Sequence, residues 1–199
     1  MLLHSYVLAK ILVRMGDSAG AARMLLRVAQ NISSFPKDVV RILTSTVVLC
    51  QKAGLKASSY EYAKALMHPE HRAAIDDNFK RKIEAIVRRK SSNAEDTPEE
   101  LSLCPISQQM IPMTQLECPT TRDAIPMCII TGRHMTVDDW CFCPRSGFPA
   151  TLTEYIRYID VIGRSQDAKE EGEGGAVDPI LGQPVSITEL VKTTQEEVQ

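Results

Sequence analysis

Three Cys-Pro pairs are the residues of this sequence whose types and spacing best suit one chemistry, the binding of zinc. Each pair begins like a Cys-Pro-x-Cys turn, at Cys104, Cys118 and Cys143. A Cys-x-x-Cys turn supplies two of the four N or S ligands that a structural zinc ion needs. In all three turns, a hydroxyl residue stands where the second cysteine would be: Ser107, Thr121 and Ser146. The pattern therefore indicates a zinc-ribbon-like architecture that has lost ligands.

A fourth phrase has the same outline without any cysteine. In Asp178-Pro179-Ile180-Leu181, Asp178 and Leu181 occupy the two ligand positions. Because each remaining half-site keeps at most one thiolate, its zinc affinity is expected to be much lower than that of an intact turn.

Five possible ligands nevertheless gather within 26 residues, and Cys104 adds a sixth from upstream. The five are Cys118, Cys128, His134, Cys141 and Cys143. We predict at most one zinc ion and no other cofactor, with ligands drawn from Cys104, Cys118, Cys128, His134 and Cys143. In the alternative interpretation, the thiols are small apolar groups packed around Trp140, Phe142 and Phe148.

Catalysis and nucleic-acid binding are weaker interpretations of the same residues. A cysteine nucleophile activated by His134 would need an orienting group and an oxyanion stabiliser, and no suitable motif surrounds these residues, so no catalytic residue is predicted. The basic runs 80–82 and 88–90 lack interleaved aromatic residues and a nucleic-acid motif. They favour a solvated helix face or an acidic protein partner over RNA.

Charge divides the chain into two regions. Residues 1–90 carry 16 Lys and Arg against 7 Asp and Glu, whereas residues 91–199 carry 7 against 18. Such asymmetry indicates two physically distinct regions.

No secretory leader and no run of about 18 apolar residues is evident, so we expect an intracellular, reducing compartment and no membrane insertion.

The basic region has helical periodicity. Apolar spacing predicts helices over 8–15, 18–32, 36–53, 58–68 and 76–90, with Gly16 and Gly54 ending the first and third. The two glycines are 38 residues apart, a period typical of helical-hairpin repeats. We predict the end of a TPR-like solenoid over residues 1–90 and interpret Met1 as lying within a longer array. A five-helix bundle is the alternative.

The acidic region is organised differently. Residues 91–103 are predicted to form an acidic linker, and 104–162 a cysteine-rich, zinc-ribbon-like domain that ends in a helix over 152–162. Residues 163–199 are predicted to contain a flexible Glu/Gly stretch at 166–175, the degenerate turn at Asp178, and a short helix over 187–193 capped by Ser186. The expected fold class is mainly α, with a small irregular second domain.

Specific phrases resemble the C-terminal region of the WD-repeat-containing protein 19 family. The most specific is Ile-Pro-Met-Cys-Ile-Ile-Thr-Gly-Arg-His-Met at 125–135, followed by Asp-Asp-Trp at 138–140 and Gly-Phe-Pro-Ala at 147–150. Similar phrases occur throughout the helical region, at 2–6, 20–25, 31–36, 42–47, 53–56 and 82–89. The resemblance covers nearly the whole chain in order.

The resemblance implies a non-catalytic subunit of intraflagellar transport complex A, with WD40 propellers, a helical solenoid and a cysteine-rich tail. It implies a role in retrograde ciliary or flagellar transport and in cilium assembly, at the cilium, basal body and cytoplasm. The implied partners are the other subunits of that complex, with no nucleic acid, direct membrane insertion or small-molecule substrate.

This chain departs from the family pattern at the zinc turns. Family members have cysteines at the positions of Ser107, Thr121 and Ser146, while Cys141 matches no family ligand. The alternative function is a RING-like ubiquitin ligase or vesicle-tethering subunit at the end of a trafficking solenoid. A RING needs eight ligands in interleaved pairs, and only Cys141 and Cys143 form a close cysteine pair here.

Overall fold

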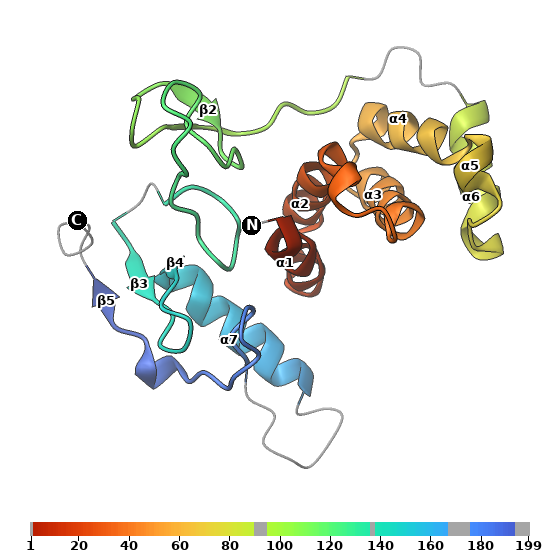
Figure 1. Cartoon of the computed structure of the whole chain (residues 1–199). Coiled ribbons are helices and arrows are strands. Elements are labelled where there is room, and N and C mark those ends of the chain that lie inside the picture. Colours follow the sequence, from red (N-terminus) through yellow and green to blue (C-terminus); the bar gives the residue numbers. More distant parts are fainter. Residues whose placement is uncertain (1, 90–94, 136–137, 167–175, 194–199) are drawn as a thin grey trace. The chain divides into compact units, whose positions relative to one another are not determined.

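A computed structural model describes residues 2–89, 95–135, 138–166 and 176–193. The chain divides into two compact units. Unit 1 comprises Met1–Ala9 with Asp17–Pro98, and unit 2 comprises Lys10–Gly16 with Glu99–Gln199. Helices dominate the first unit, whereas the second combines short strands with one long helix (Figure 1). The coarse prediction of a mainly helical chain is confirmed.

The helical region contains six α-helices among the described residues. These are α1 (Leu2–Arg14), α2 (Ser18–Gln30), α3 (Val39–Lys52), α4 (Lys56–Leu66), α5 (Pro69–Arg72) and α6 (Asp77–Arg88), with a 3₁₀ turn, η1 (Ile32–Ser34), after α2. Asp17 begins α2 by accepting a hydrogen bond from the Gly20 N–H at 2.7 Å. Gly16 and Gly54 have positive φ angles of 84° and 79°, the left-handed conformation in which glycine commonly follows a helix end.

The apolar residues that recur with helical spacing form the core of unit 1. Helix α3 packs against both α2 and α4, and its buried residues are Ile42, Leu43, Thr46, Val47 and Cys50. Leu43 and Val47 share one cluster with Leu66 and Ile83. The predicted helix at 36–53 begins three residues later than expected because Pro36–Asp38 form a turn, and the four-residue α5 was not predicted.

Unit 2 is built from short antiparallel strands. Strands β1 (Leu101–Leu103) and β2 (Met110–Pro112) form a hairpin. Strands β3 (Trp140–Phe142), β4 (Pro149–Thr151) and β5 (Lys192–Thr193) form a second sheet, with β3 in the middle. Its register pairs Trp140 with both Thr151 and Thr193. Residues 101–103, which were predicted to be linker, thus belong to a strand.

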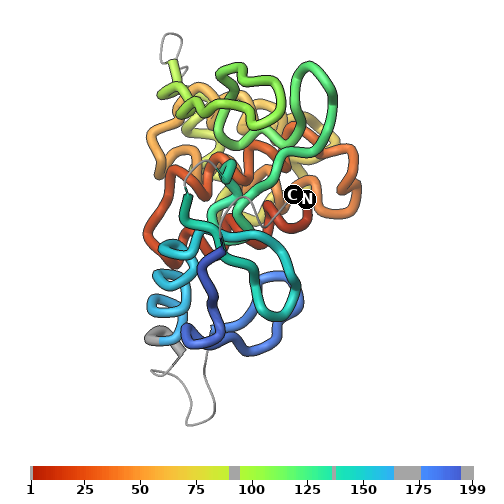
Figure 2. The backbone as a smooth tube through the Cα atoms, turned by 90° about the vertical axis from the view of Figure 1, so that its left-hand side faces the viewer, coloured from red at the N-terminus to blue at the C-terminus, as the bar shows by residue number. Residues whose placement is uncertain are grey.

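The long helix α7 (Leu152–Gln166) follows β4 directly. Its buried side includes Tyr155, Tyr158 and Ile162, as the periodicity predicted. The Tyr158 hydroxyl donates to the Val177 carbonyl at 2.6 Å, and the segment from 176 runs beside α7 in both views (Figures 1 and 2). This contact joins the Asp178 region to the cysteine-rich region.

Two further predictions concern the end of the chain. The expected helix at 187–193 is only a 3₁₀ turn, η2 (Ile187–Glu189), because Lys192–Thr193 pair with β3. Its predicted cap is confirmed: Ser186 accepts from the Thr188 N–H, in a capping box with Glu189. The predicted flexible stretch at 166–175 lies, apart from Gln166, outside the described residues.

No helix in the described part of the chain has the length and apolar character to cross a membrane.

Candidate functional site: five knuckle turns

Five turns in unit 2 share one backbone geometry, and we call them knuckle turns 104, 118, 128, 143 and 178 after their first residue. In each, the first N–H donates to the carbonyl five residues later, at 2.8 or 2.9 Å. The N–H four residues later donates back to the first carbonyl, at 2.8–3.0 Å. Antiparallel pairing flanks every turn, either within the hairpins or as an isolated bridge.

The fifth position of each turn has a positive φ angle. Glycine fills it in turns 128, 143 and 178, whereas Gln108 and Arg122 adopt φ of 57° and 67° in turns 104 and 118. A non-glycine residue in this region is uncommon, so surrounding contacts must hold these two turns in place. All five turns thus have the same backbone conformation, although none of them has cysteines at both ligand positions.

Knuckle turn 128 was not predicted from the sequence. Cys128 was identified only as a possible ligand, because Ile129 stands where the other four turns have proline. The sign that would have identified it is Gly132, which occupies the position equivalent to Gly147 and Gly182.

Turns 104 and 118 meet in one cluster. Cys104 and Cys118 are both fully buried and pack together with Ile111 and Ile125. The Cys104 sulfur accepts a hydrogen bond from the Ser107 N–H at 3.4 Å. Hydrogen bonds from the Thr121 hydroxyl and N–H are the main causes that lower the pKa of Cys118 from 9.0 to about 6. These donors belong to the same turn as Cys118.

Turns 143 and 178 also meet, through a carboxylate. The Cys143 thiol donates to Asp178 Oδ2 at 2.8 Å, and the Tyr155 hydroxyl lies 3.0 Å from the Cys143 sulfur. Asp178 Oδ1 accepts from the N–H groups of Ile180 at 2.6 Å and Leu181 at 3.0 Å. Asp178 is only 1% exposed, so these bonds replace its hydration.

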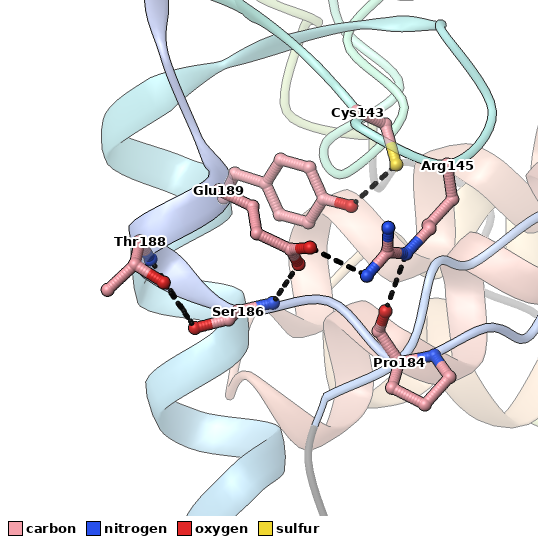
Figure 3. Close-up of polar contacts among 7 residues, drawn as sticks. Cys143, Arg145, Pro184, Ser186, Thr188 and Glu189 are labelled. Atoms are coloured by element: carbon pink, nitrogen blue, oxygen red, sulfur yellow. Dashed lines mark hydrogen bonds and ion pairs between the residues drawn. The ribbon is translucent and has the colours of Figure 1, made fainter.

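A second contact between these two turns lies nearer the surface. Arg145 forms a 2.7 Å ion pair with Glu189 and donates to the Pro184 carbonyl at 2.9 Å. Glu189 also accepts from the Ser186 N–H at 3.0 Å (Figure 3). Turn 178 is therefore fixed to turn 143 by a buried thiol–carboxylate bond and by this partly exposed clamp.

The remaining predicted ligands lie elsewhere. The Cys128 sulfur accepts from the Thr151 N–H of β4 at 3.3 Å. The Cys141 thiol donates to the Ala150 carbonyl at 3.5 Å, and burial is the main cause that raises its pKa to about 12. Cys50 lies apart in the core of unit 1.

His134 uses both ring nitrogens in hydrogen bonds. Its Nδ1 lies 2.6 Å from the Ser102 hydroxyl, and its Nε2 lies 2.6 Å from the Gln115 carbonyl. A carbonyl oxygen only accepts, so Nε2 carries the hydrogen. His134, which is 5% exposed, joins β1 to the segment that follows β2.

The donor set fits a zinc ion poorly. The described residues contain no group of three or more His, Cys, Asp or Glu side chains able to hold a metal. The Ser107 and Ser146 oxygens are buried with no hydrogen-bond partner among the described residues, although Ser107 lies near Cys118 and Ser146 near Asp178. The zinc ion stays a prediction, and the part of the chain that the structure describes does not assemble the eight ligands of a RING.

Asp178 makes the stability of unit 2 depend on pH. Burial raises the pKa of Asp178, but hydrogen bonds from Cys143, Leu181 and Ile180 outweigh this and lower the pKa from its ordinary value of 3.8. A depressed carboxyl pKa stabilises the fold above the unfolded-state pKa, and that stability is lost as pH falls through the folded-state pKa. We expect the free energy of unfolding to fall below about pH 4. Urea titrations followed by Trp140 fluorescence would measure this free energy at each pH. Asp178→Asn should reduce its fall at low pH, whereas Asp123→Asn, at an exposed side chain, should leave that fall unchanged.

Comparison with known proteins identifies relatives of this chain. No family model matches it. It is 52% identical over 155 residues to WD repeat-containing protein 19 of Mus musculus and 49% identical over 154 residues to that of Homo sapiens. It is 41% identical over 155 residues to WD repeat-containing protein dyf-2 of Caenorhabditis elegans.

The alignments cover 78%, 77% and 78% of this chain but 11% of each relative. The chain therefore spans about a tenth of the length of the relatives that it matches. Within that limit, the resemblance predicted from the phrases at 125–135 and 147–150 is confirmed. Over the matched stretch, this chain is a homologue of WD repeat-containing protein 19 and of dyf-2.

Proposed function

We propose that this chain is a non-catalytic assembly module of intraflagellar transport complex A. In this proposal, it serves retrograde ciliary or flagellar transport and cilium assembly, and it binds other subunits of that complex at the cilium, basal body and in the cytoplasm. The relatedness to WD repeat-containing protein 19 and dyf-2 carries the proposal.

The proposed architecture is the end of a TPR-like helical-hairpin solenoid followed by a degenerate zinc-ribbon-like domain. The α2–α3 and α3–α4 packing and the glycine turns at 16 and 54 support the first part. The five knuckle turns support the second. Stacked helical hairpins and small turn-rich domains present extended surfaces suited to protein contacts.

The side-chain chemistry of unit 2 also favours binding over catalysis. All six cysteines are buried. Ser102 and His134 form a hydroxyl–imidazole pair, but they are 6% and 5% exposed, and the second imidazole nitrogen donates to a main-chain carbonyl. A catalytic pair needs access to substrate and an oxyanion stabiliser. This pair instead joins two segments of the fold.

An exposed apolar surface on the β1–β2 hairpin is suited to a protein partner. Leu101, Leu103 and Met110 are 55%, 52% and 58% exposed, and they line a pocket of about 420 Å³ together with Pro105, Met113 and Met135. Apolar patches of this kind mark interaction sites on soluble proteins. We assign this surface to a sibling subunit of the complex.

Co-purification of the tagged chain from ciliated cells tests the proposal. We expect other subunits of the complex to be recovered with the wild-type chain and at least about tenfold less with Leu103→Glu, as when about 1.4 kcal/mol of binding free energy is lost. Leu181→Glu is the matched control, because Leu181 is also 52% exposed but lies in turn 178. Recovery of no ciliary transport subunit with the folded wild-type chain would contradict the function. Equal recovery with both variants would contradict only the surface.

A further inference from the structure

Knuckle turns 104 and 118 bring four potential ligand positions together. Cys104 and Cys118 belong to one buried cluster, and the hydroxyls of Ser107 and Thr121 both approach the Cys118 sulfur. The first and fourth residues of the two turns therefore converge. In paired Cys-x-x-Cys turns, these are the positions that supply the four thiolates of a structural zinc site.

The groups at these positions form a poor ligand set. Zinc in proteins is held by cysteine sulfur, histidine nitrogen or carboxylate oxygen, whereas this pair offers two sulfurs and two neutral hydroxyls. The same hydroxyls are suitable hydrogen-bond partners for sulfur. Within turn 104, the Ser107 N–H donates to the Cys104 sulfur, and the two turns meet where Cys104 and Cys118 pack together with Ile111 and Ile125.

In the second pair of turns, a carboxylate and a thiol occupy two of the positions where a zinc site would have cysteines. Turns 143 and 178 offer a thiol at 143, a hydroxyl at 146, a carboxylate at 178 and an aliphatic side chain at 181. The carboxylate already accepts the Cys143 thiol at 2.8 Å and two backbone N–H groups. A zinc ion would have to displace these donors from Asp178 and would still lack a fourth protein ligand.

We infer that buried packing in the first pair of knuckle turns and a thiol–carboxylate hydrogen bond in the second take the place of zinc, so that unit 2 folds and stays folded without metal. Ser107, Thr121 and Asp178 stand at positions where a zinc site would need cysteine. The Ser107 N–H donates to the Cys104 sulfur at 3.4 Å, and Asp178 accepts the Cys143 thiol at 2.8 Å. The first pair lies only two substitutions from a four-cysteine site. This inference does not depend on the proposed function.

Metal content and chelator sensitivity of the full chain test the inference. The wild-type chain, expressed with added zinc and dialysed, should retain far less than one zinc ion per chain by elemental analysis. Its urea midpoint, followed by Trp140 fluorescence, should be the same with and without phenanthroline. Retention of about one zinc per chain, with a midpoint that falls when the chelator is added, would overturn the inference.

Restoring the ligands provides a second test. Ser107→Cys with Thr121→Cys should bind one zinc or cobalt ion, the latter with a tetrahedral thiolate spectrum. Free zinc at about 100 times its Kd should raise the ratio of folded to unfolded chain about 100-fold. The matched Ser107→Ala/Thr121→Ala chain should not respond to zinc.

The cysteine variant also has an outcome that contradicts the inference. A cysteine variant that retains wild-type Trp140 fluorescence but takes up no metal would show that the turns do not converge, and the inference would be wrong. If that variant does not fold, the zinc content and chelator response of the wild-type chain decide the question.

Discussion

Asp178→Ala should lower the free energy of unfolding of unit 2 by about 3–4 kcal/mol, since it breaks a buried, charge-assisted network. The substitution removes the acceptor of the Cys143 thiol and of the Ile180 and Leu181 N–H groups. These donors would be left unsatisfied beside a small cavity. Urea denaturation followed by the fluorescence of Trp140, the single tryptophan of the chain, reports on this unit.

Two further variants separate the network from a general effect of losing an aspartate. Asp178→Asn keeps the side-chain outline and an oxygen acceptor, and should cost about 1–2 kcal/mol through loss of charge. Asp123→Ala alters an exposed side chain in turn 118 and should cost less than about 0.5 kcal/mol. A loss at Asp178→Ala no larger than that at Asp123→Ala would show that turn 178 is not held by this carboxylate.

The helical part of the fold follows from local patterns in the sequence. Apolar spacing and the turns at Gly16 and Gly54 located the helices that became α2, α3, α4 and α6, because helix formation and capping are decided within a few residues. The missed α5 is a single turn after Pro69, too short to produce a periodic pattern. The start of α3 at Val39 differs because the chain from Pro36 to Asp38 turns before the helix begins.

The site was only partly predictable because its pairing is not local. Four knuckle turns were found from Cys-Pro or Asp-Pro and the residue three positions on, but no sequence rule shows which turns face each other. The Cys143–Asp178 bond joins residues 35 positions apart, across residues 167–175, which have no apolar pattern. Asp178 therefore looked like a lost ligand, whereas the structure gives it a stabilising role.

Replacing His134 should also destabilise unit 2 strongly. His134→Ala removes the donor to the Gln115 carbonyl and the partner of the Ser102 hydroxyl, both at 2.6 Å, and leaves a cavity behind a 5% exposed side chain. Losing two buried hydrogen bonds and the ring volume should cost about 3 kcal/mol. The urea midpoint of Trp140 fluorescence should fall accordingly, while His68→Ala, at an exposed position without a side-chain cap bond, should leave the midpoint unchanged.

The response of His134→Ala to chelator distinguishes a structural role from metal ligation. A ligand that holds a stabilising zinc ion acts only while the metal is bound, so chelating the metal from the wild-type chain would reproduce the loss seen in the variant. A hydrogen-bonding role predicts the same difference of about 3 kcal/mol with and without phenanthroline, because the Ser102 and Gln115 contacts involve no metal. A difference that disappears in the chelator would assign His134 to zinc and would require a ligand set other than the one formed by these turns.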